Sequence, residues 1–220
     1  MAGEPGSALV FFKFPIQAAS LAFSFHCSIA KSDPHLRLRS VDEIRMFAEE
    51  GELFGVRSAA SNVLALCYAA LDESSNEYEV GGLAVLPEVQ QLGVASVLAR
   101  FAIAHIIAND RPWHYGYRIV AYVHEDNQNP RALVDRLGFQ HIGRFTLKNA
   151  VTSTMKQNPK GEVMGDKFEF PRACVKQLLN WFEKEFRNLL RDGVTPAIIE
   201  LKPGGLQSII EALRQEAAEL

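Results

Sequence analysis

The chain has 220 residues, of which 48% are hydrophobic and 22% are charged, and its formal net charge is −3. This length allows a sizeable core, either in one domain with extensions or in two small domains. The mildly acidic balance argues against a general nucleic-acid binder, which usually carries an excess of basic residues.

Cysteine, histidine and hydropathy patterns argue against disulfide-rich, metal-binding, secreted and membrane-spanning proteins. Cys27, Cys67 and Cys174 stand far apart and form no CxxC pair, which argues against a disulfide framework or a zinc knuckle and for a reducing compartment. The six histidines show no metal-ligand spacing, so we expect no metal. The uncharged run Phe14–Ala30 is too short for a membrane span and has little positive charge before it, unlike a secretory signal. We therefore expect a cytoplasmic protein without nucleic-acid or membrane partners.

The first half of the chain alternates strand and helix patterns. Residues Ala8–Phe14 are rich in β-forming side chains and end at Pro15, which predicts a strand. Ser40 can cap the start of a helix, and Glu43, three residues later, completes a capping-box pattern. An apolar stripe follows at helical spacing. In chain order we expect a strand at Ala8–Phe14, helices at Ile16–Lys31 and Ser40–Gly51, and strands at Leu53–Ala59, Val63–Leu71 and Glu77–Leu86.

A long helix opens the second half, because apolar residues recur on one helical face from Val94 to Ile106. After it we expect a strand at Tyr117–Val123, a helix at Asn129–Leu137, and a strand pair at Phe139–Lys148 and Gly161–Phe170. Two amphipathic helices at Val175–Leu190 and Leu206–Ala217, with a short strand at Ala197–Leu201 between them, form an extension over residues 172–220. The extension either packs on the core or mediates association, as a dimerisation surface or a lid.

The loop before the long helix has the composition of an anion-binding loop. It contains Gln90, Gly93 and Ala95 and opens directly into the helix. The first turn of a helix carries four unpaired N–H groups and roughly half a positive charge from the helix dipole. A glycine there lets an anion approach the backbone closely. An ordinary connecting loop with a chance glycine is the alternative.

Gln90-x-x-Gly93-x-Ala95 resembles the Gln/Arg-x-x-Gly-x-Gly/Ala signature of the GNAT superfamily of N-acetyltransferases, and the element order matches the GNAT fold from Ala8 to about Pro171. The resemblance implies an α/β (α+β) fold over residues 1–171, with a mixed, mostly antiparallel central sheet flanked by helices, followed by the C-terminal helical extension. It also implies acetyl-CoA as co-substrate. The residues that would hold its pyrophosphate are Gln90, Gln91, Leu92, Gly93, Val94, Ala95 and Ser96.

The resemblance also suggests a catalytic base. In part of the family, a glutamate eleven residues before the signature glutamine deprotonates the acceptor amine, and counting back from Gln90 gives Glu79. A base is useful because a lysine-like amine has a pKa of about 10.4. Glu77 competes for this role, since it lies two residues earlier on the same strand face. An exposed carboxylate at a strand end is the structural alternative for Glu79.

The strand that carries Glu79 has a further implied role. By the same resemblance, backbone groups of Leu83, Ala84 and Val85 run along the pantetheine arm, and one of their N–H groups stabilises the carbonyl oxyanion. The pair Gly81-Gly82 lies in the same strand. Because glycine weakens a strand, this pair predicts a bulge or the close approach of a ligand.

Residues Asn127–Phe139 (NQNPRALVDRLGF) resemble a second family block, Asn-x-x-Ala-x-x-Leu-Tyr-x-x-Leu-Gly-Phe. Asn127 carries over as a cofactor contact. Val134 replaces the tyrosine that often protonates the leaving thiolate, and valine has no proton to donate. Either another group is the acid or the thiolate leaves unassisted, which a thiol pKa of about 8–9 allows. The candidate acids nearby in sequence are Tyr115, Tyr117, Tyr122 and His124.

Together these features predict an N-acetyltransferase that moves the acetyl group of acetyl-CoA to a primary amine by direct attack in a ternary complex. The alternative, which Val134 favours, is a non-catalytic CoA- or acyl-CoA-binding sensor or interaction module. The acceptor pocket would come from residues 16–51 and 144–165, and their sequence does not identify the amine. The extension also allows a homodimer.

Overall fold

The computed structural model describes residues 9–58, 60–147, 157–186, 198–200 and 205–220. Within these residues, eight strands form one sheet in the order β6-β7-β5-β4-β3-β2-β1-β8. Neighbouring strands are antiparallel except for the pairs β4–β5 and β1–β8. The predicted mixed, mostly antiparallel sheet is therefore confirmed.

The strands lie close to their predicted positions. Most strands begin and end within one or two residues of the predicted positions. The strands are β1 Leu9–Lys13, β2 Leu53–Ser58, β3 Val63–Asp72, β4 Glu77–Val85, β5 Arg118–His124, β6 Gln140–Leu147, β7 Val163–Phe170 and β8 Ile198–Glu200.

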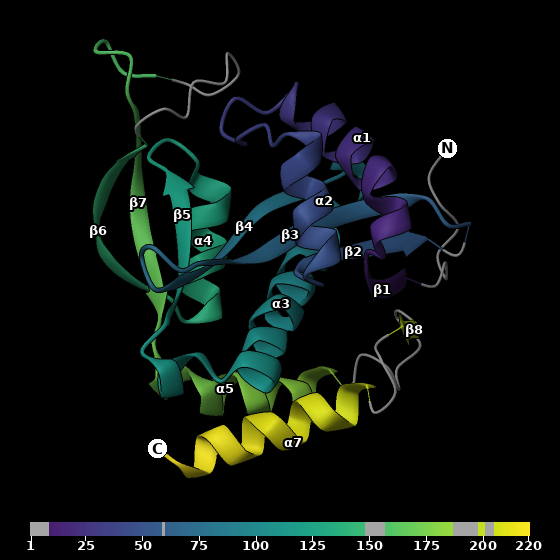
Figure 1. The fold of residues 1–220 in the computed structure, drawn as a ribbon, viewed down its shortest axis with the longest axis vertical. Coiled ribbons are helices and arrows are strands. Elements are labelled where there is room, and N and C mark those ends of the chain that lie inside the picture. The colour runs from purple at the N-terminus through teal and green to yellow at the C-terminus, as the bar shows by residue number, and fades with distance from the viewer. Residues whose placement is uncertain (1–8, 59, 148–156, 187–197, 201–204) are drawn as a thin grey trace.

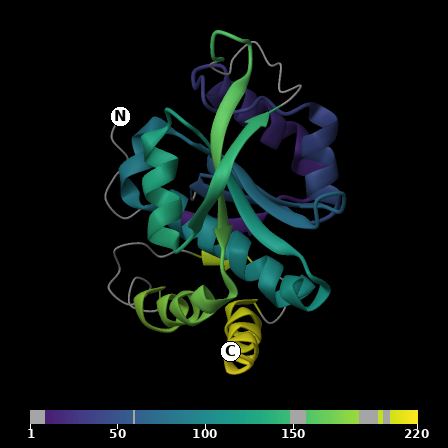
Figure 2. The ribbon, with the colours of Figure 1, turned by 90° about the vertical axis from the view of Figure 1, so that its left-hand side faces the viewer.

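The helices cover both faces of the sheet (Figure 1). One face packs against α1 (Ala19–Ala30) and α2 (Val41–Glu49), and the other against α3 (Val94–Asp110) and α4 (Gln128–Leu137). Figure 2 shows the two helix layers on either side of the sheet. At the start of α2, Ser40 accepts a hydrogen bond from the Glu43 N–H and the Glu43 side chain returns one to Ser40, which confirms the expected capping box.

The C-terminal extension packs on the core. Helix α5 (Val175–Asn180), the π-helical turn Trp181–Phe186 and helix α7 (Gly205–Ala218) share one apolar cluster with α3. The ring of Phe101 in α3 meets Phe182 and Phe186 edge to face, at centroid distances of 5.2 and 5.4 Å. The extension thus covers the flank of the helix that follows the predicted phosphate loop. Residues 187–190 of the helix predicted to end at Leu190 lie outside the described residues.

Strand β4 carries a bulge. Tyr68 of β3 lies opposite Gly81, whereas Leu66, two residues earlier, lies opposite Ala84, so β4 has one extra residue there. Gly82 adopts the left-handed conformation, with φ of +60°, which glycine reaches at low cost. The predicted irregularity at Gly81-Gly82 is therefore confirmed, and it bends β4 away from its neighbours.

One segment differs from the expected pattern. Residues 87–92, predicted as a loop, form a short 3₁₀ helix, Pro87–Leu92. For the predicted strand pair the sequence gives no order; strand β7 lies between β5 and β6, so β6 is at the edge of the sheet. Among the described helices, none combines the length and the apolar character that a membrane crossing requires.

Candidate functional site

The sheet opens between β4 and β5. These parallel strands pair only where Glu77–Glu79 face Arg118–Val120. Beyond that point the β4 bulge turns the strands apart, and two cavities occupy the opening. Because side chains alternate along a strand, Val80 and Val123 line the cavity on one face, and Glu79 lines the cavity on the other.

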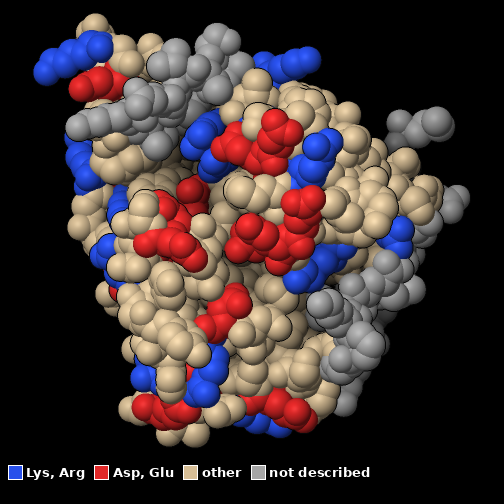
Figure 3. Space-filling model, viewed as in Figure 1, with Lys and Arg blue, Asp and Glu red and all other residues tan. Residues whose placement is uncertain are grey.

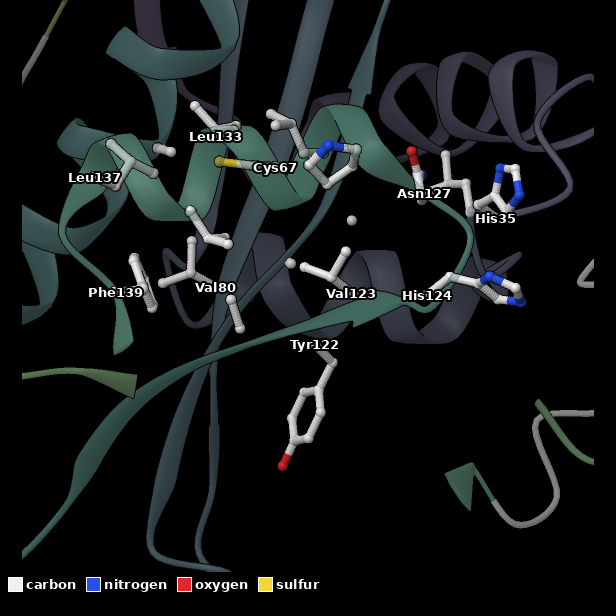
Figure 4. A pocket seen from close by; sticks show the side chains of 18 of the residues that line it. His35, Cys67, Val80, Tyr122, Val123, His124, Asn127, Leu133, Leu137 and Phe139 are labelled. Carbon is white, nitrogen blue, oxygen red and sulfur yellow. The ribbon is translucent and has the colours of Figure 1, made fainter. Parts of the chain in front are cut away.

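The first cavity, called here the α4 cavity, lies between the opened strands and helix α4 and has a volume of about 130 Å³. Its β4 wall is Val80, Gly81, Gly82 and Leu83, and its β5 wall is Ala121, Tyr122, Val123 and His124. Figure 4 shows Asn127 and His35 at one end of this cavity, and Leu137 and Phe139 at the other.

The second cavity, called here the Glu79 cavity, has a volume of about 260 Å³. It lies between β3–β5, the loop that joins α1 to α2, and the β6–β7 pair. Both cavities share the lining residues His35, Leu36, Gly81, Gly82, Tyr122 and His124. The two cavities therefore adjoin at the β4 bulge.

Glu79 is held by two neighbours. Its Oε1 accepts a hydrogen bond of 2.6 Å from the Tyr68 hydroxyl and one of 3.3 Å from Arg39 Nη2. Burial, followed by the nearby Glu79 carboxylate, raises the pKa of Tyr68, so that this phenol stays protonated and donates. Within the described residues both bonds fall on Oε1, which leaves Oε2 as the oxygen that can accept a further proton.

Glu77 has a different environment. It is 1% exposed and makes ion pairs with Arg118 and Lys167. Its Oε2 also accepts a hydrogen bond of 2.8 Å from the Tyr122 hydroxyl. Its carboxylate is thus occupied on both oxygens and does not line the Glu79 cavity. The geometry favours Glu79 over Glu77 as the base.

The predicted phosphate loop lies at the start of α3. Gly93 separates the 3₁₀ helix Pro87–Leu92 from α3 and adopts φ of +75°, a left-handed conformation. A Cβ at this position would meet no atom within 4 Å, so the space above the loop is open. Side chains of Gln90 and Leu92 are exposed, and Val94 is buried. The unpaired N–H groups of the first turn of α3 are therefore available to an anion.

The other predicted cofactor residues divide into three groups. Leu83 and Asn127 line the α4 cavity. Ala84 and Val85 are buried in the core, so only their backbone could contact a ligand. Gln90, Ala95 and Ser96 belong to the loop and the first turn of α3, outside the cavity lining. The Gln90 side chain donates a hydrogen bond of 3.2 Å to the Val85 carbonyl oxygen, and the side chain of Gln91 lies outside the described residues.

The four candidate acids lie in different places. Tyr115 is 73% exposed, and the ring of Tyr117 packs on Tyr78 at 5.7 Å. Tyr122 lines both cavities, but its hydroxyl donates to Glu77, and burial followed by that carboxylate raises its pKa. His124 also lines both cavities.

Val134 is buried and lines the α4 cavity.

The sequence gives no signal for three further residues that line the cavities: His35, Arg39 and Tyr68. Arg39 donates a hydrogen bond of 2.8 Å to Glu43 Oε1, and it also donates hydrogen bonds to the Tyr68 hydroxyl and to Glu79. The His35 ring lies 4.9 Å from the His124 ring. These contacts join residues far apart in the sequence, so no local motif announces them.

Outside both cavities, His114, Glu216 and Glu219 place possible metal-ligand atoms within 4.8 Å of one another. However, Arg172 binds both carboxylates, at 2.6 and 3.0 Å, so their charge is already compensated. The absence of a metal remains a prediction.

Comparison with known proteins supports the same fold. Residues 55–147 match the family model of FR47-like proteins. This region contains β4, the β4 bulge, the Gly93 loop and the Asn127–Phe139 block. No curated protein matches the chain in sequence.

Solved structures with the same fold are numerous, and the three named here have low sequence identity. The ribosomal-protein-S18-alanine N-acetyltransferase of Escherichia coli has 16% identity and a TM-score of 0.51, covering 74% of this chain and 93% of its own. Arabidopsis thaliana NAA60, in complex with a bisubstrate analogue, has 11% identity and a TM-score of 0.55, covering 74% and 97%. A phosphinothricin acetyltransferase of the GNAT superfamily from Sinorhizobium meliloti, in complex with AcCoA, has 12% identity and a TM-score of 0.53, covering 74% and 87%. The predicted GNAT fold is confirmed, and the acyltransferase activity stays a prediction.

Proposed function

We propose that this chain, which has the GNAT fold, is an acyltransferase that moves the acetyl group of acetyl-CoA to a primary amine by direct attack in a ternary complex. The observation that carries this proposal is the pair of cavities on opposite faces of the sheet, which meet at the β4 bulge and share Gly81, Gly82, Tyr122 and His124. A binding module alone would need only the first cavity, so this geometry disfavours a sensor.

The donor lies on the α4 side in this proposal. The open N-terminus of α3 at Gly93 holds the pyrophosphate. The pantetheine arm enters the α4 cavity past Asn127, and the thioester carbonyl lies at the bulge. There a backbone N–H of the Gly82–Leu83 segment donates to the carbonyl oxygen as negative charge develops on it.

The acceptor lies in the Glu79 cavity. Its amine must be neutral to attack, and Glu79 Oε2 takes the proton directly or through a water molecule. Tyr68 and Arg39 fix the carboxylate by holding Oε1. The remaining wall combines the charged side chains of Arg37 and Asp72 with apolar ones such as Leu36, Phe145 and Met164, which suits an amine with both polar and apolar parts.

The reaction is a single displacement. The amine nitrogen attacks the thioester carbon, the C–N bond forms, the C–S bond breaks, and the electron pair leaves with the sulfur. His124 is the assigned hydrogen-bond donor to the leaving thiolate, because the other candidates are exposed, packed away or bonded to Glu77. Its Nδ1 accepts a hydrogen bond of 3.2 Å from the Asp126 N–H, which favours the tautomer with its proton on Nε2.

Thiol release from acetyl-CoA tests this function. The protein is incubated with acetyl-CoA and a panel of polyamines, amino acids, aminoglycosides and short peptides, and free thiol is measured over time. We expect release with one amine class and the matching N-acetyl product by mass spectrometry. Binding of CoA in calorimetry without release for any class would contradict the enzyme and restore the sensor.

A further inference from the structure

The α4 cavity continues beyond the place of the thioester. Its mouth carries the polar side chains of His35, His124 and Asn127, whereas its inner end is apolar (Figure 4). All residues of the inner end are buried, and they come from β3, α3, β5 and α4 and from the residue before β6. They are Cys67, Ala99, Ala121, Leu133, Leu137 and Phe139.

The inner end contains no charged side chain. Its most polar group is the Cys67 thiol, which is 1% exposed, and burial raises the pKa of this thiol. The group therefore stays neutral and behaves as a small apolar side chain. A chamber of this composition offers nothing to a polar ligand, and it suits a hydrocarbon chain.

The orientation of the thioester follows from the shape of the opening. The strands are closed where Glu79 faces Val120 and open toward Asn127. If the pantetheine arm enters from the open end, the acyl group on the other side of the carbonyl points toward the closed, apolar end. Val80 and Ala121, the first residues past the last paired positions, form the entrance of this inner end.

Small side chains widen the inner end of the α4 cavity. The volume of about 130 Å³ is that of the whole cavity, including the mouth through which the pantetheine arm would enter. Two of the wall residues, Ala99 and Ala121, have minimal side chains, and Val134 occupies less space than an aromatic residue would. These small side chains favour an acyl group longer than acetyl.

We propose that the inner end of the α4 cavity is an acyl pocket, and that this protein accepts CoA thioesters of straight acyl chains of about three to four carbons in addition to acetyl-CoA. The inference rests on the proposed function, since it needs a CoA thioester in this cavity. The transfer step is unchanged: the amine attacks the acyl carbon, the C–S bond breaks, and the longer acyl group becomes the amide.

A chain-length series tests the acyl pocket. Affinities of acetyl-, propionyl-, butyryl- and hexanoyl-CoA are measured by calorimetry, and kcat/KM is measured with any amine found active. We expect up to about fourfold tighter binding for each methylene through butyryl-CoA, because each adds buried apolar surface. Hexanoyl-CoA should bind more weakly than butyryl-CoA. Tightest binding by acetyl-CoA would overturn the proposal.

Two variants move the preference in opposite directions. Ala121→Val fills the inner end and should shift the optimum to acetyl-CoA, whereas Leu137→Ala enlarges it and should shift the optimum toward hexanoyl-CoA. Leu178→Ala is the control, because Leu178 is a buried leucine of α5 that does not line the cavity. It should lose stability and keep the wild-type chain-length profile.

The outcomes separate the two claims. Acetyl transfer with no change of profile in either cavity variant would overturn the acyl pocket and leave the proposed function standing. Failure of every CoA thioester and of CoA itself to bind the folded wild type would contradict both.

Discussion

At Glu79, two hydrogen bonds converge on one carboxylate oxygen. Tyr68 lies directly across from the β4 bulge, and Arg39 reaches the same oxygen from the loop before α2. Gly81 is part of this arrangement, because a Cβ there would lie 2.6 Å from Glu79 Oε1 and 2.7 Å from the Tyr68 hydroxyl. The glycine pair thus makes room for the side chains that orient the base.

Replacing Glu79 by glutamine removes the proton acceptor and keeps the size of the side chain. We expect kcat to fall about 10²- to 10³-fold, within the usual range for loss of a general base, while the affinity for CoA stays unchanged. Steady-state rates and calorimetry measure the two quantities. Glu73→Gln is the matched control, since Glu73 is an exposed carboxylate outside both cavities and should change kcat little. Wild-type turnover by the Glu79 variant would remove this residue as base.

His124 is expected to assist the departing sulfur. His124→Gln should lower kcat about tenfold with little change in KM for acetyl-CoA, because a thiolate is a fair leaving group and needs only modest help. His141→Gln serves as the control, since His141 is an exposed histidine of β6 outside both cavities. If both variants keep the wild-type kcat, the thiolate leaves unassisted.

At the scale of elements, helix α3 links the candidate phosphate site to the rest of the molecule. Its first turn follows Gly93, its middle packs on the sheet, and Phe101 contacts the C-terminal extension. Arg100 of the same helix lies 4.8 Å from the Trp181 ring and bonds Ser96 in the first turn. The extension therefore braces the helix whose N-terminus is the proposed anion site.

Two substitutions at Gly93 separate conformation from charge. Gly93→Ala introduces a Cβ at φ of +75° and should cost about 1 kcal/mol in strain, with a modest loss of CoA affinity. Gly93→Glu adds the same strain and also places a negative charge at the helix N-terminus, so CoA binding should be abolished. Calorimetric titration of both variants measures the difference. Equal affinities for the two variants would contradict the assignment of this loop to phosphate.

The turn between α2 and β2 gives a pH-dependent prediction. Burial, opposed by a hydrogen bond from the Leu71 N–H and reinforced by Glu50, raises the pKa of Glu52 to about 7. Its Oε2 is buried without a partner among the described residues. Because the folded state binds this proton more tightly than the unfolded state, stability falls as pH rises from about 4.5 to about 7.

Glu52→Gln keeps the acceptor for the Leu71 N–H and removes the charge. We expect the variant to match the wild type at pH 4 and to be more stable at pH 8 by about 1 kcal/mol, after allowance for solvent screening of this half-buried group. That corresponds to a rise in Tm of about 2–4 °C. Thermal unfolding at both pH values checks the prediction, and a variant less stable than the wild type at pH 8 would contradict it.

At the scale of the whole molecule, acidic and basic side chains are interspersed over the face of Figure 3, with several acidic side chains near its centre. This surface agrees with the net charge of −3 and differs from the continuous basic surface typical of nucleic-acid binders. The face shown therefore offers no continuous basic surface for a nucleic acid.

Much of the fold follows from local sequence patterns. Helices α2 and α4 begin and end close to the positions that the sequence predicts. The short strand β8 also lies where its β-forming residues predict it. The bulge at Gly81-Gly82 was also predictable, because two adjacent glycines disturb a strand. The place of β7 between β5 and β6 was not, since it depends on which strand edges meet after the chain has collapsed.

The site was predictable only in part, for a physical reason. Glu79, Leu83, Asn127 and Val134 belong to short motifs, and the structure brings all four to the two cavities. Arg39 and Tyr68 reach Glu79 across 40 and 11 residues of sequence, and such contacts leave no periodic or spaced signal. The acyl pocket likewise arises from α3, α4 and three strands together.

The kinetic order of the reaction tests the central claim most directly. Initial rates are measured with acetyl-CoA and the active amine varied together. Because the two cavities meet through the sheet, both substrates should bind before any product leaves, and the reciprocal plots should intersect. Parallel plots, with acetyl-enzyme trapped in the absence of amine, would mean that the chain carries the acetyl group itself and would contradict direct transfer between the cavities.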